Sequence, residues 1–186
     1  MRSLALIACL AASIGAALAV LGLSLRPFGL ALGVALGVID QAADSLAQAV
    51  RGSDLVMLAV PVRAARSVLA EIRPVLGEDA ILSDVGSTKA SFVADVESVF
   101  GELPPRVVPG HPIAGSERSG VAAANGELFH RHRVILTPLP EQDEEALALV
   151  RRLWESAGAE VVCMAVAEHD AVLAATSHLP HVLAYC

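Results

Sequence analysis

The segment GHPIAGSERSG, residues 110–120, gathers the side chains best suited to acid–base chemistry: one imidazole, two hydroxyls, a carboxylate and a guanidinium, set among glycines. It follows Val107 and Val108, which we expect to end a buried strand. His111 would then lie at the carboxyl edge of this strand, where open α/β sheets bind their ligands. A neutral imidazole, with an ordinary pKa of about 6.5, suits a general base at physiological pH. The segment therefore makes His111 the candidate base, and a structural loop histidine is the alternative.

The elements that must position this segment alternate between short apolar runs and amphipathic stretches. Further strands are expected within residues 53–61, 79–87, 133–138 and 159–164. Helices are expected over residues 62–73, 88–100 and 141–158, and in the last of these apolar residues recur every three or four positions until Gly158 closes the helix. Strands alternating with helices of this length predict right-handed βαβ units, and hence a doubly wound, mainly parallel α/β sheet.

After Met164 this alternation stops. Residues 165–186 are helical in character apart from Pro180, and no further strand follows. We therefore predict an α/β domain over residues 1–165 and the beginning of an all-helical domain over residues 166–186.

The N-terminal run, residues 3–25, carries no charge and has two interpretations. It could be an export signal or a membrane anchor, since it is long enough to cross a bilayer as a helix. It could instead be a buried helix, a break at Gly15 and a buried strand over residues 20–25. Strands of a parallel sheet covered on both faces read as continuous apolar runs. Because the rest of the chain predicts such a sheet, we favour the second interpretation and expect no membrane association.

Composition narrows the class of protein. The 186 residues suffice for one domain and part of another, and with 55% hydrophobic and 18% charged residues the chain is not disordered. A net charge of −7 with only 13 Lys and Arg argues against nucleic-acid binding, so the expected ligand is a small molecule. The three cysteines form no CxxC pair, which argues against a disulfide framework or a zinc site and favours a reducing cytoplasm.

Six short motifs carry a resemblance to a known family. LAVP, DVGSTK, GHPIAGSERSG, LF, ILTP and SHLPH follow one another in an order and spacing that resemble the prephenate dehydrogenases, a family that includes arogenate and cyclohexadienyl dehydrogenases. The resemblance runs from about Ser3 to Cys186. It implies a Rossmann-like dinucleotide-binding domain, and a helical domain that makes a homodimer of the full-length protein. The implied activity is the oxidative decarboxylation of prephenate or arogenate with hydride transfer to NAD(P), in tyrosine biosynthesis.

Two departures from the family pattern matter. The family begins with a strand and a GxGxxG turn, whose amides approach the cofactor pyrophosphate, and the match here starts only at Ser3. Most of the family's helical domain is also absent, so we expect this chain alone to be inactive and to be a fragment or a mis-started gene model. The alternative is a non-catalytic α/β remnant, or a membrane-tethered sensor, that has lost nucleotide binding.

The resemblance also implies roles for individual residues. His111 matches the catalytic histidine, and Ser87 matches a serine that orients the substrate hydroxyl and the nicotinamide. His181 matches a substrate contact, with His178 and Ser177 as neighbours. Glu117 matches an acid that pairs with cationic groups at the pocket mouth, an exposed loop glutamate being the alternative. The three-residue spacing of His178 and His181 would also suit a metal, but no third ligand is evident and no metal site is expected.

Cofactor contacts are expected after two of the strands. Ser24 stands where the family usually has an aspartate that binds the ribose hydroxyls, and Arg26 follows it. A serine does not repel a 2′-phosphate, so this pair favours NADP over NAD, the alternative being a solvated strand end. Ala59, Val60 and Pro61 are expected to line the adenosine or nicotinamide side.

Overall fold

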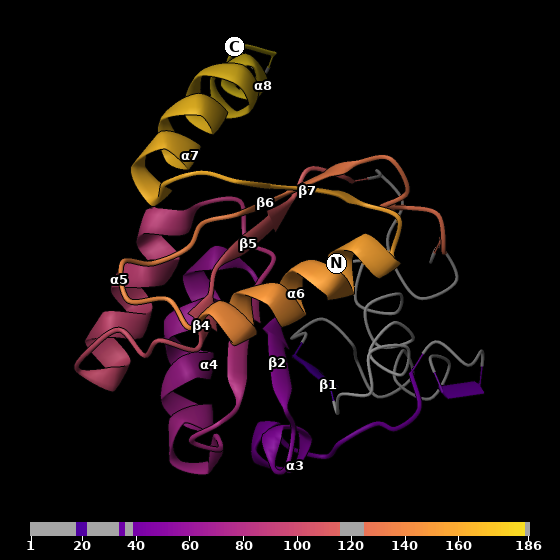
Figure 1. Cartoon of the computed structure of the whole chain (residues 1–186), viewed down its shortest axis with the longest axis vertical. Helices are drawn as coiled ribbons and strands as arrows, with labels where there is room; N and C mark the ends of the chain where they lie inside the picture. Colours follow the sequence, from indigo (N-terminus) through magenta and orange to yellow (C-terminus); the bar gives the residue numbers. More distant parts are fainter. Residues whose placement is uncertain (1–17, 22–33, 36–38, 116–124, 185–186) are drawn as a thin grey trace.

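The computed structural model describes residues 18–21, 34–35, 39–115 and 125–184 (Figure 1). Its first sheet contains four parallel strands in the order β1 (Leu18–Leu21), β2 (Leu55–Leu58), β3 (Ile81–Asp84) and β4 (Val107–Val108). Its second sheet contains β5 (Gly110–Pro112), β6 (Arg133–Leu136) and β7 (Glu160–Cys163). In that sheet β5 runs antiparallel to β6, and β6 runs parallel to β7. The prediction of a mainly parallel α/β fold is therefore confirmed.

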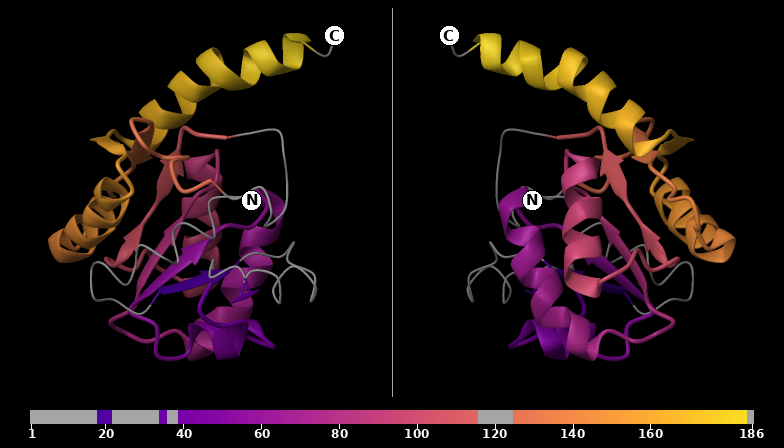
Figure 2. Two further views of the ribbon diagram at one scale, coloured as in Figure 1. Left: turned by 90° about the vertical axis from the view of Figure 1, so that its right-hand side faces the viewer. Right: turned by 90° about the vertical axis from the view of Figure 1, so that its left-hand side faces the viewer.

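The helices connect these strands and continue beyond the last of them. They are α3 (Leu46–Val50), α4 (Ala65–Ile72), α5 (Lys89–Phe100), α6 (Glu144–Ser156), α7 (Val166–Leu173) and α8 (Leu179–Ala184). Short 3-10 segments, Val62–Ala64 and Arg73–Val75, flank α4, and a π-helical segment, Ala174–His178, joins α7 to α8. Figure 2 shows α7 and α8 as one curved rod that projects past the sheets to the C-terminus.

Both faces of the parallel sheet are covered, which explains why its strands read as unbroken apolar runs. Alternate side chains of β2 belong to opposite cores: Val56 and Leu58 pack with α4 and α5, whereas Leu55 and Met57 pack with α6. Figure 2 shows these helices on the two sides of the strands. Trp154 of α6 is fully buried in the second core and meets Phe129 edge to face, with ring centroids 5.0 Å apart.

Sequence signals set the ends of the helices that follow β3 and β6. Asp143 caps α6 by accepting hydrogen bonds from the N–H groups of Glu145 and Ala146. Gly101 after α5 and Gly158 after α6 both have positive φ, of +86° and +76°, a conformation that strongly favours glycine. The prediction that Gly158 closes the long acidic helix is confirmed.

The observed elements differ from the expected ones in three places. The strand expected at residues 20–25 already begins at Leu18 in β1, and residues 22–25 lie outside the described residues, as do Gly15 and the helix expected before it. The short helix α3 and the strand β5 were not predicted. Within the part of the chain that the structure describes, no helix is both long and apolar enough to span a bilayer.

Candidate active site

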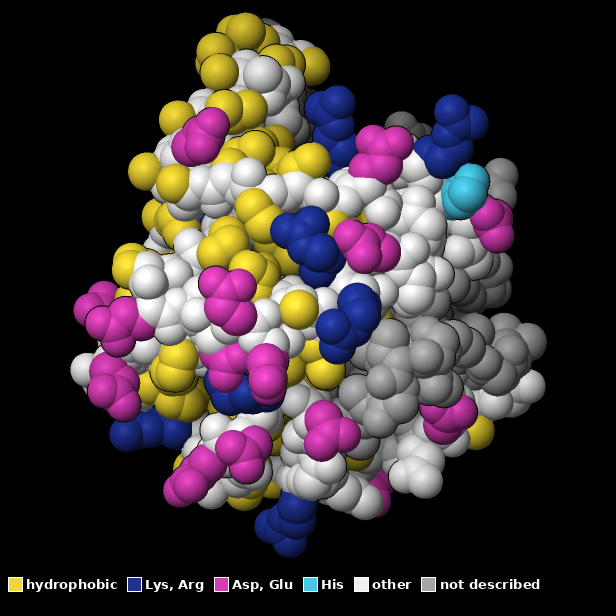
Figure 3. Space-filling view, viewed as in Figure 1, with side chains coloured by type: hydrophobic (Ala, Val, Ile, Leu, Met, Phe, Trp, Pro, Cys, Tyr) yellow, Lys and Arg dark blue, Asp and Glu magenta, His cyan; other side chains and the backbone are white. Residues whose placement is uncertain are grey.

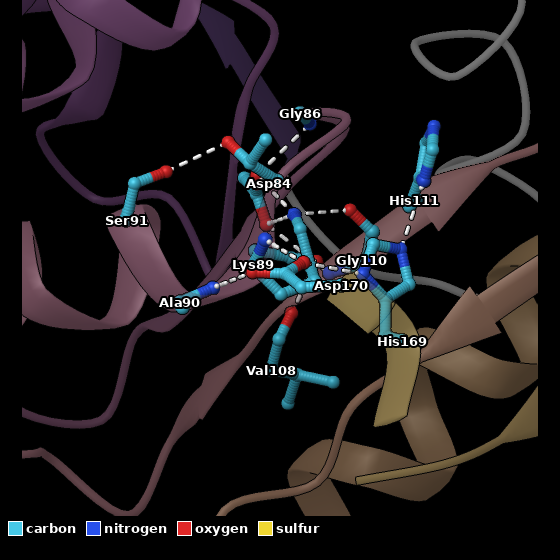
Figure 4. Close-up of polar contacts among 12 residues, drawn as sticks. Asp84, Gly86, Lys89, Ala90, Ser91, Val108, Gly110, His111, His169 and Asp170 are labelled. Carbon is cyan, nitrogen blue, oxygen red and sulfur yellow. Dashed lines mark hydrogen bonds and ion pairs between the residues drawn. The ribbon is translucent and has the colours of Figure 1, made fainter. Parts of the chain in front are cut away.

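The carboxyl ends of β3 and β4, the start of β5 and the start of α5 meet around a buried ion pair, Asp84 with Lys89 (Figure 4). The Nζ atom of Lys89 lies 2.6 Å from Oδ1 of Asp84 and 2.7 Å from the carbonyl oxygen of Gly110, and it also donates to Oδ2 of Asp84. The carboxylate accepts two more hydrogen bonds, from the N–H groups of Gly86 and Gly110. All three protons of this ammonium therefore have acceptors.

The ion pair is almost inaccessible to solvent. The Lys89 side chain is 0% exposed and that of Asp84 is 5% exposed. Burial raises the pKa of Asp84 and lowers the pKa of Lys89, and the attraction between the two charges opposes both shifts. Buried charges are tolerated only when paired and fully hydrogen-bonded, as they are here.

This pair fixes the backbone beside the candidate base. Gly110, which both donates to Asp84 and accepts from Lys89, immediately precedes His111 in β5. A Cβ atom at Gly110 would lie 3.1 Å from the carbonyl oxygen of Asp84 and 3.2 Å from Cδ2 of Leu136, so β5 and β3 approach too closely for a larger residue without movement. Glycine at this position lets the strand that carries His111 pack against the end of β3.

A hydrogen-bonded row of three side chains links His111 to the start of α5 (Figure 4). Nδ1 of His111 lies 2.9 Å from Nε2 of His169, and Nδ1 of His169 lies 2.7 Å from Oδ1 of Asp170. The two oxygens of Asp170 accept hydrogen bonds of 2.9 Å from the N–H groups of Lys89 and Ala90. Asp170 of α7 thus caps α5, although the two helices are far apart in the sequence. Thr88, the residue at the N-cap position of α5, makes no such bond.

The electrostatic surroundings favour a neutral imidazole and a charged carboxylate. Burial lowers the pKa of His111 to about 4, and its neighbours Lys89, His169 and His178 act in the same direction while Asp170 opposes them. Burial alone would raise the pKa of Asp170, but hydrogen bonds from the amides of Lys89 and Ala90 and from His169 hold it below its usual range. At physiological pH this row therefore contains an unprotonated His111 and an ionised Asp170.

A pocket lies at the carboxyl ends of β2 and β3, next to the buried ion pair. Its lining is mainly apolar, with few polar groups. The lining residues are Leu58, Val60, Val62, Ala65, Asp84, Gly86, Thr88 and Phe92. Of the residues predicted to contact a cofactor, only Val60 belongs to this lining, while Ala59 is buried and Pro61 is exposed beside it. Ser87 is exposed in the turn between β3 and α5, flanked by two lining residues.

The remaining predicted site residues lie after β7 or outside the described residues. Ser177 is exposed and His178 half-buried in the π-helical segment, and His178 is near enough to His111 to influence its pKa. His181 lies in α8, three residues further on. Ser24, Arg26 and Glu117 lie outside the described residues.

Sequence reasoning missed three members of this site, Asp84, His169 and Asp170. Lys89 ends the motif DVGSTK, and from the sequence it could equally have met anionic groups or been an exposed lysine; the structure buries it completely. Asp84 offered a signal, as a charge at the end of an apolar strand, and Lys89 follows five residues later. His169 also offered one, because Val166, His169 and Leu173 share the i, i+3, i+7 spacing of a buried helix face. Asp170, one residue after His169, offered none of its own.

Comparison with known proteins gives concordant matches. The family model described as "Prephenate dehydrogenase, nucleotide-binding domain" matches residues 11–163. The chain is 44% identical over 152 residues to the cyclohexadienyl dehydrogenase of Zymomonas mobilis, covering 81% of this chain and 51% of that protein. It is 40% identical over 152 residues to the prephenate dehydrogenase of Bacillus subtilis, covering 80% of this chain and 40% of that protein. The chain thus spans about half the length, or less, of these relatives.

Solved structures of similar proteins extend the agreement to the fold. The prephenate dehydrogenase of Aquifex aeolicus in complex with hydroxyphenyl propionate and NAD⁺ superposes with a TM-score of 0.84 at 36% identity, covering 97% of this chain and 63% of that one. The arogenate dehydrogenase of Synechocystis superposes with a TM-score of 0.81 at 27% identity, covering 95% of this chain and 60% of that one. These matches confirm the predicted Rossmann-like fold class.

Proposed function

The chain belongs to the prephenate dehydrogenase family, and from this premise we propose that the full-length protein is an NAD(P)-dependent dehydrogenase that oxidatively decarboxylates prephenate or arogenate in tyrosine biosynthesis. The observation that carries the proposal is the half-buried imidazole of His111, hydrogen-bonded to His169 at the carboxyl edge of the parallel sheet. The non-catalytic alternative is not favoured, because the matched relatives are named as dehydrogenases.

His111 is the proposed acceptor of the substrate's hydroxyl proton. As the carbon–hydrogen bond at the alcohol carbon breaks, the hydride leaves and the hydroxyl proton passes to the imidazole, so that a neutral ketone forms instead of a protonated one. With its pKa near 4, His111 is in the unprotonated form that this role requires at physiological pH. A well-placed general base of this kind contributes about 10²–10⁴-fold to the rate.

Decarboxylation then needs no further catalytic group. The bond between the ring and the carboxylate breaks, its electrons move through the dienone to the carbonyl oxygen, and that oxygen takes back a proton as the ring becomes aromatic. Aromatisation supplies the driving force. The protein's task is to orient the ring, and we propose that His178, His181, Ser177 and Glu117 do so.

We propose that a dinucleotide binds at the residues around this pocket, because the matched family model is that of a nucleotide-binding domain. What such a cofactor supplies when bound is an acceptor for the hydride. Val60, with its neighbours Ala59 and Pro61, would hold the adenosine or nicotinamide side, and the apolar lining supports this assignment. We propose that Ser87 orients both the nicotinamide and the substrate hydroxyl, because Gly86 and Thr88 on either side of it line the same pocket. We further propose NADP over NAD from Ser24 and Arg26.

The helical segment after the α/β sheet supports two proposals about the whole protein. We propose a domain boundary near residue 165, because β7 ends at Cys163 and only helices follow among the residues described. We also propose a homodimer made through these helices, whose exposed apolar side chains include Val172, Leu179, Val182 and Leu183 (Figure 3). An exposed free thiol at Cys163 suits the reducing cytoplasm, where we propose that the protein acts.

The experiment that tests this function is a direct assay of the purified full-length protein. Reduction of NAD or NADP is followed with prephenate and with arogenate, and one of the two substrates should be turned over. His111→Asn should lower kcat by about 10²–10⁴-fold and leave cofactor affinity unchanged, since the lost group acts on the substrate proton. His132→Asn is the matched control, because His132 is exposed and its ring contacts the backbone carbonyl of His130, away from His111 and His169. Full activity of His111→Asn would remove the proposed base.

A further inference from the structure

We propose that His169 and Asp170 are positioning residues that fix the tautomer of His111, so that Nε2 of His111 is the atom that accepts the substrate proton. This proposal deepens the proposed function and depends on it. It names two residues that the sequence analysis did not find.

The tautomer follows from counting donors and acceptors along the row. An ionised carboxylate has no proton to donate, so Nδ1 of His169 must donate to Oδ1 of Asp170 across their 2.7 Å contact. With a single ring proton on His169, its Nε2 carries a lone pair, and Nδ1 of His111 must donate to it across 2.9 Å. A neutral His111 that is protonated on Nδ1 carries its lone pair on Nε2. Each proton position is therefore determined by the next, starting from Asp170.

Asp170 is well suited to start this row. Both of its oxygens accept amide hydrogen bonds at the N-terminus of α5, where the helix dipole also favours a negative charge. These contacts keep Asp170 ionised and fix its orientation. The carboxylate that caps α5 is therefore the same one that orients the imidazole of His169.

His169 acts through His111 and cannot replace it. Its side chain is completely buried, whereas His111 is half-buried. The two rings meet edge to face, with centroids 5.1 Å apart and planes inclined by 65°, so His169 touches His111 through its edge nitrogen (Figure 4). Among the described residues, the charged and titratable groups around the row are Lys89 of α5 with its partner Asp84 of β3, and His178 after α7.

The first test reads the tautomer directly and needs no turnover. In full-length protein labelled with nitrogen-15 in its histidines, the ring nitrogen shifts of His111, assigned by comparison with His111→Asn, should show the proton on Nδ1. In Asp170→Asn the Nδ1 tautomer should lose its preference. Glu168→Gln is the matched control, because it removes an exposed carboxylate from the same helix and should leave the tautomer unchanged. A wild-type His111 protonated on Nε2 would overturn the proposal, even if the dehydrogenase activity is found.

The second test uses kinetics with the substrate that the full-length protein turns over. Asp170→Asn should lower kcat at least about tenfold, with KM for substrate and cofactor little changed, because only proton transfer is misaligned. His169→Gln, whose amide oxygen can accept from Nδ1 of His111, should keep most of the rate that His169→Leu loses. Adding Asp170→Asn to His111→Asn should cost nothing more. Equal rates for the Gln and Leu variants would refute the positioning role, whereas a wild type that turns over neither substrate would refute only the proposed function.

Discussion

Removing the ammonium of Lys89 should destabilise the fold more than any surface substitution. Lys89→Met would leave the carboxylate of Asp84 buried beside an apolar side chain, with only the amides of Gly86 and Gly110 as partners. Removing one member of a buried pair costs about 3–5 kcal/mol, because the other charge stays uncompensated. Three hydrogen bonds from Nζ are lost at the same time. We therefore expect the free energy of unfolding to fall by about 3–5 kcal/mol at neutral pH.

The pH dependence of this loss checks its cause. Without Lys89, burial would hold the pKa of Asp84 above its value in the unfolded chain. As the pH falls, Asp84 of the folded variant therefore binds a proton before the unfolded chain does. A carboxyl group whose pKa is raised by folding lowers the free energy of unfolding at pH values above that pKa. It lowers this free energy less at pH values below it. The deficit of Lys89→Met relative to wild type should therefore shrink as the pH falls and Asp84 takes up a proton.

Denaturant unfolding of the full-length protein, monitored by far-UV circular dichroism, measures this effect. Arg63→Met is the control, because Arg63 is exposed on the turn before α4 and should change stability by less than about 0.5 kcal/mol. The double variant Asp84→Asn/Lys89→Met should lose less than Lys89→Met alone, since no unpaired charge remains. If Lys89→Met costs under about 1 kcal/mol, or the double variant is the less stable of the two, the pair does not hold this end of the sheet as we argue.

Three further predictions concern the base, the close approach of β5 and the cofactor. Burial and nearby positive charges lower the pKa of His111 to about 4, so kcat/KM should stay constant from neutral pH to about pH 5 and fall only at lower pH. A fall in kcat/KM that begins near the ordinary histidine pKa of about 6.5 would contradict a buried base. Gly110→Ala should cost about 1–3 kcal/mol by thermal unfolding, because its Cβ would crowd a backbone carbonyl at 3.1 Å, and an unchanged midpoint would show that β5 can move. Ser24→Asp should shift the kcat/KM ratio toward NAD by repelling a 2′-phosphate, and a wild type that already prefers NAD strongly would refute the assignment of Ser24.

Local signals in the sequence were enough to find most of the strands and helices. The runs within residues 53–61 and 79–87 became β2 and β3 because helices cover both sheet faces, so continuous apolar sequence and burial coincide. The strand β5 has no such signal. Gly110, His111 and Pro112 include no β-branched residue, and proline argues against a strand. This strand exists because its residues pair with β6 and its first residue bonds Asp84 and Lys89.

The candidate site could be predicted only in part, because some of its residues have partners that are far away in the sequence. His111 was recognisable from its own motif, and the approach of SHLPH to the same region is supported by the influence of His178 on its pKa. The contact between His111 and His169 joins residues 58 positions apart, and Asp170 caps a helix 80 positions before it. No periodicity relates such residues, and Thr88, although threonine is a common N-cap residue, makes no capping hydrogen bond to α5. Long-range partners of this kind become visible only when the packing of α7 against α5 is known.

Lys89, the only lysine of the chain, makes these long-range contacts depend on one another. Its side chain holds β3 and β5 together through Asp84 and Gly110, while its backbone amide binds Asp170 of α7. The carboxylate that orients His169 and the ammonium that fixes the backbone before His111 therefore belong to one connected network. Residues that share such a network do not contribute independently. The α/β sheet and the first helix after it consequently act as one unit in holding the imidazole, even though the change from alternating strands to helices divides the sequence between them.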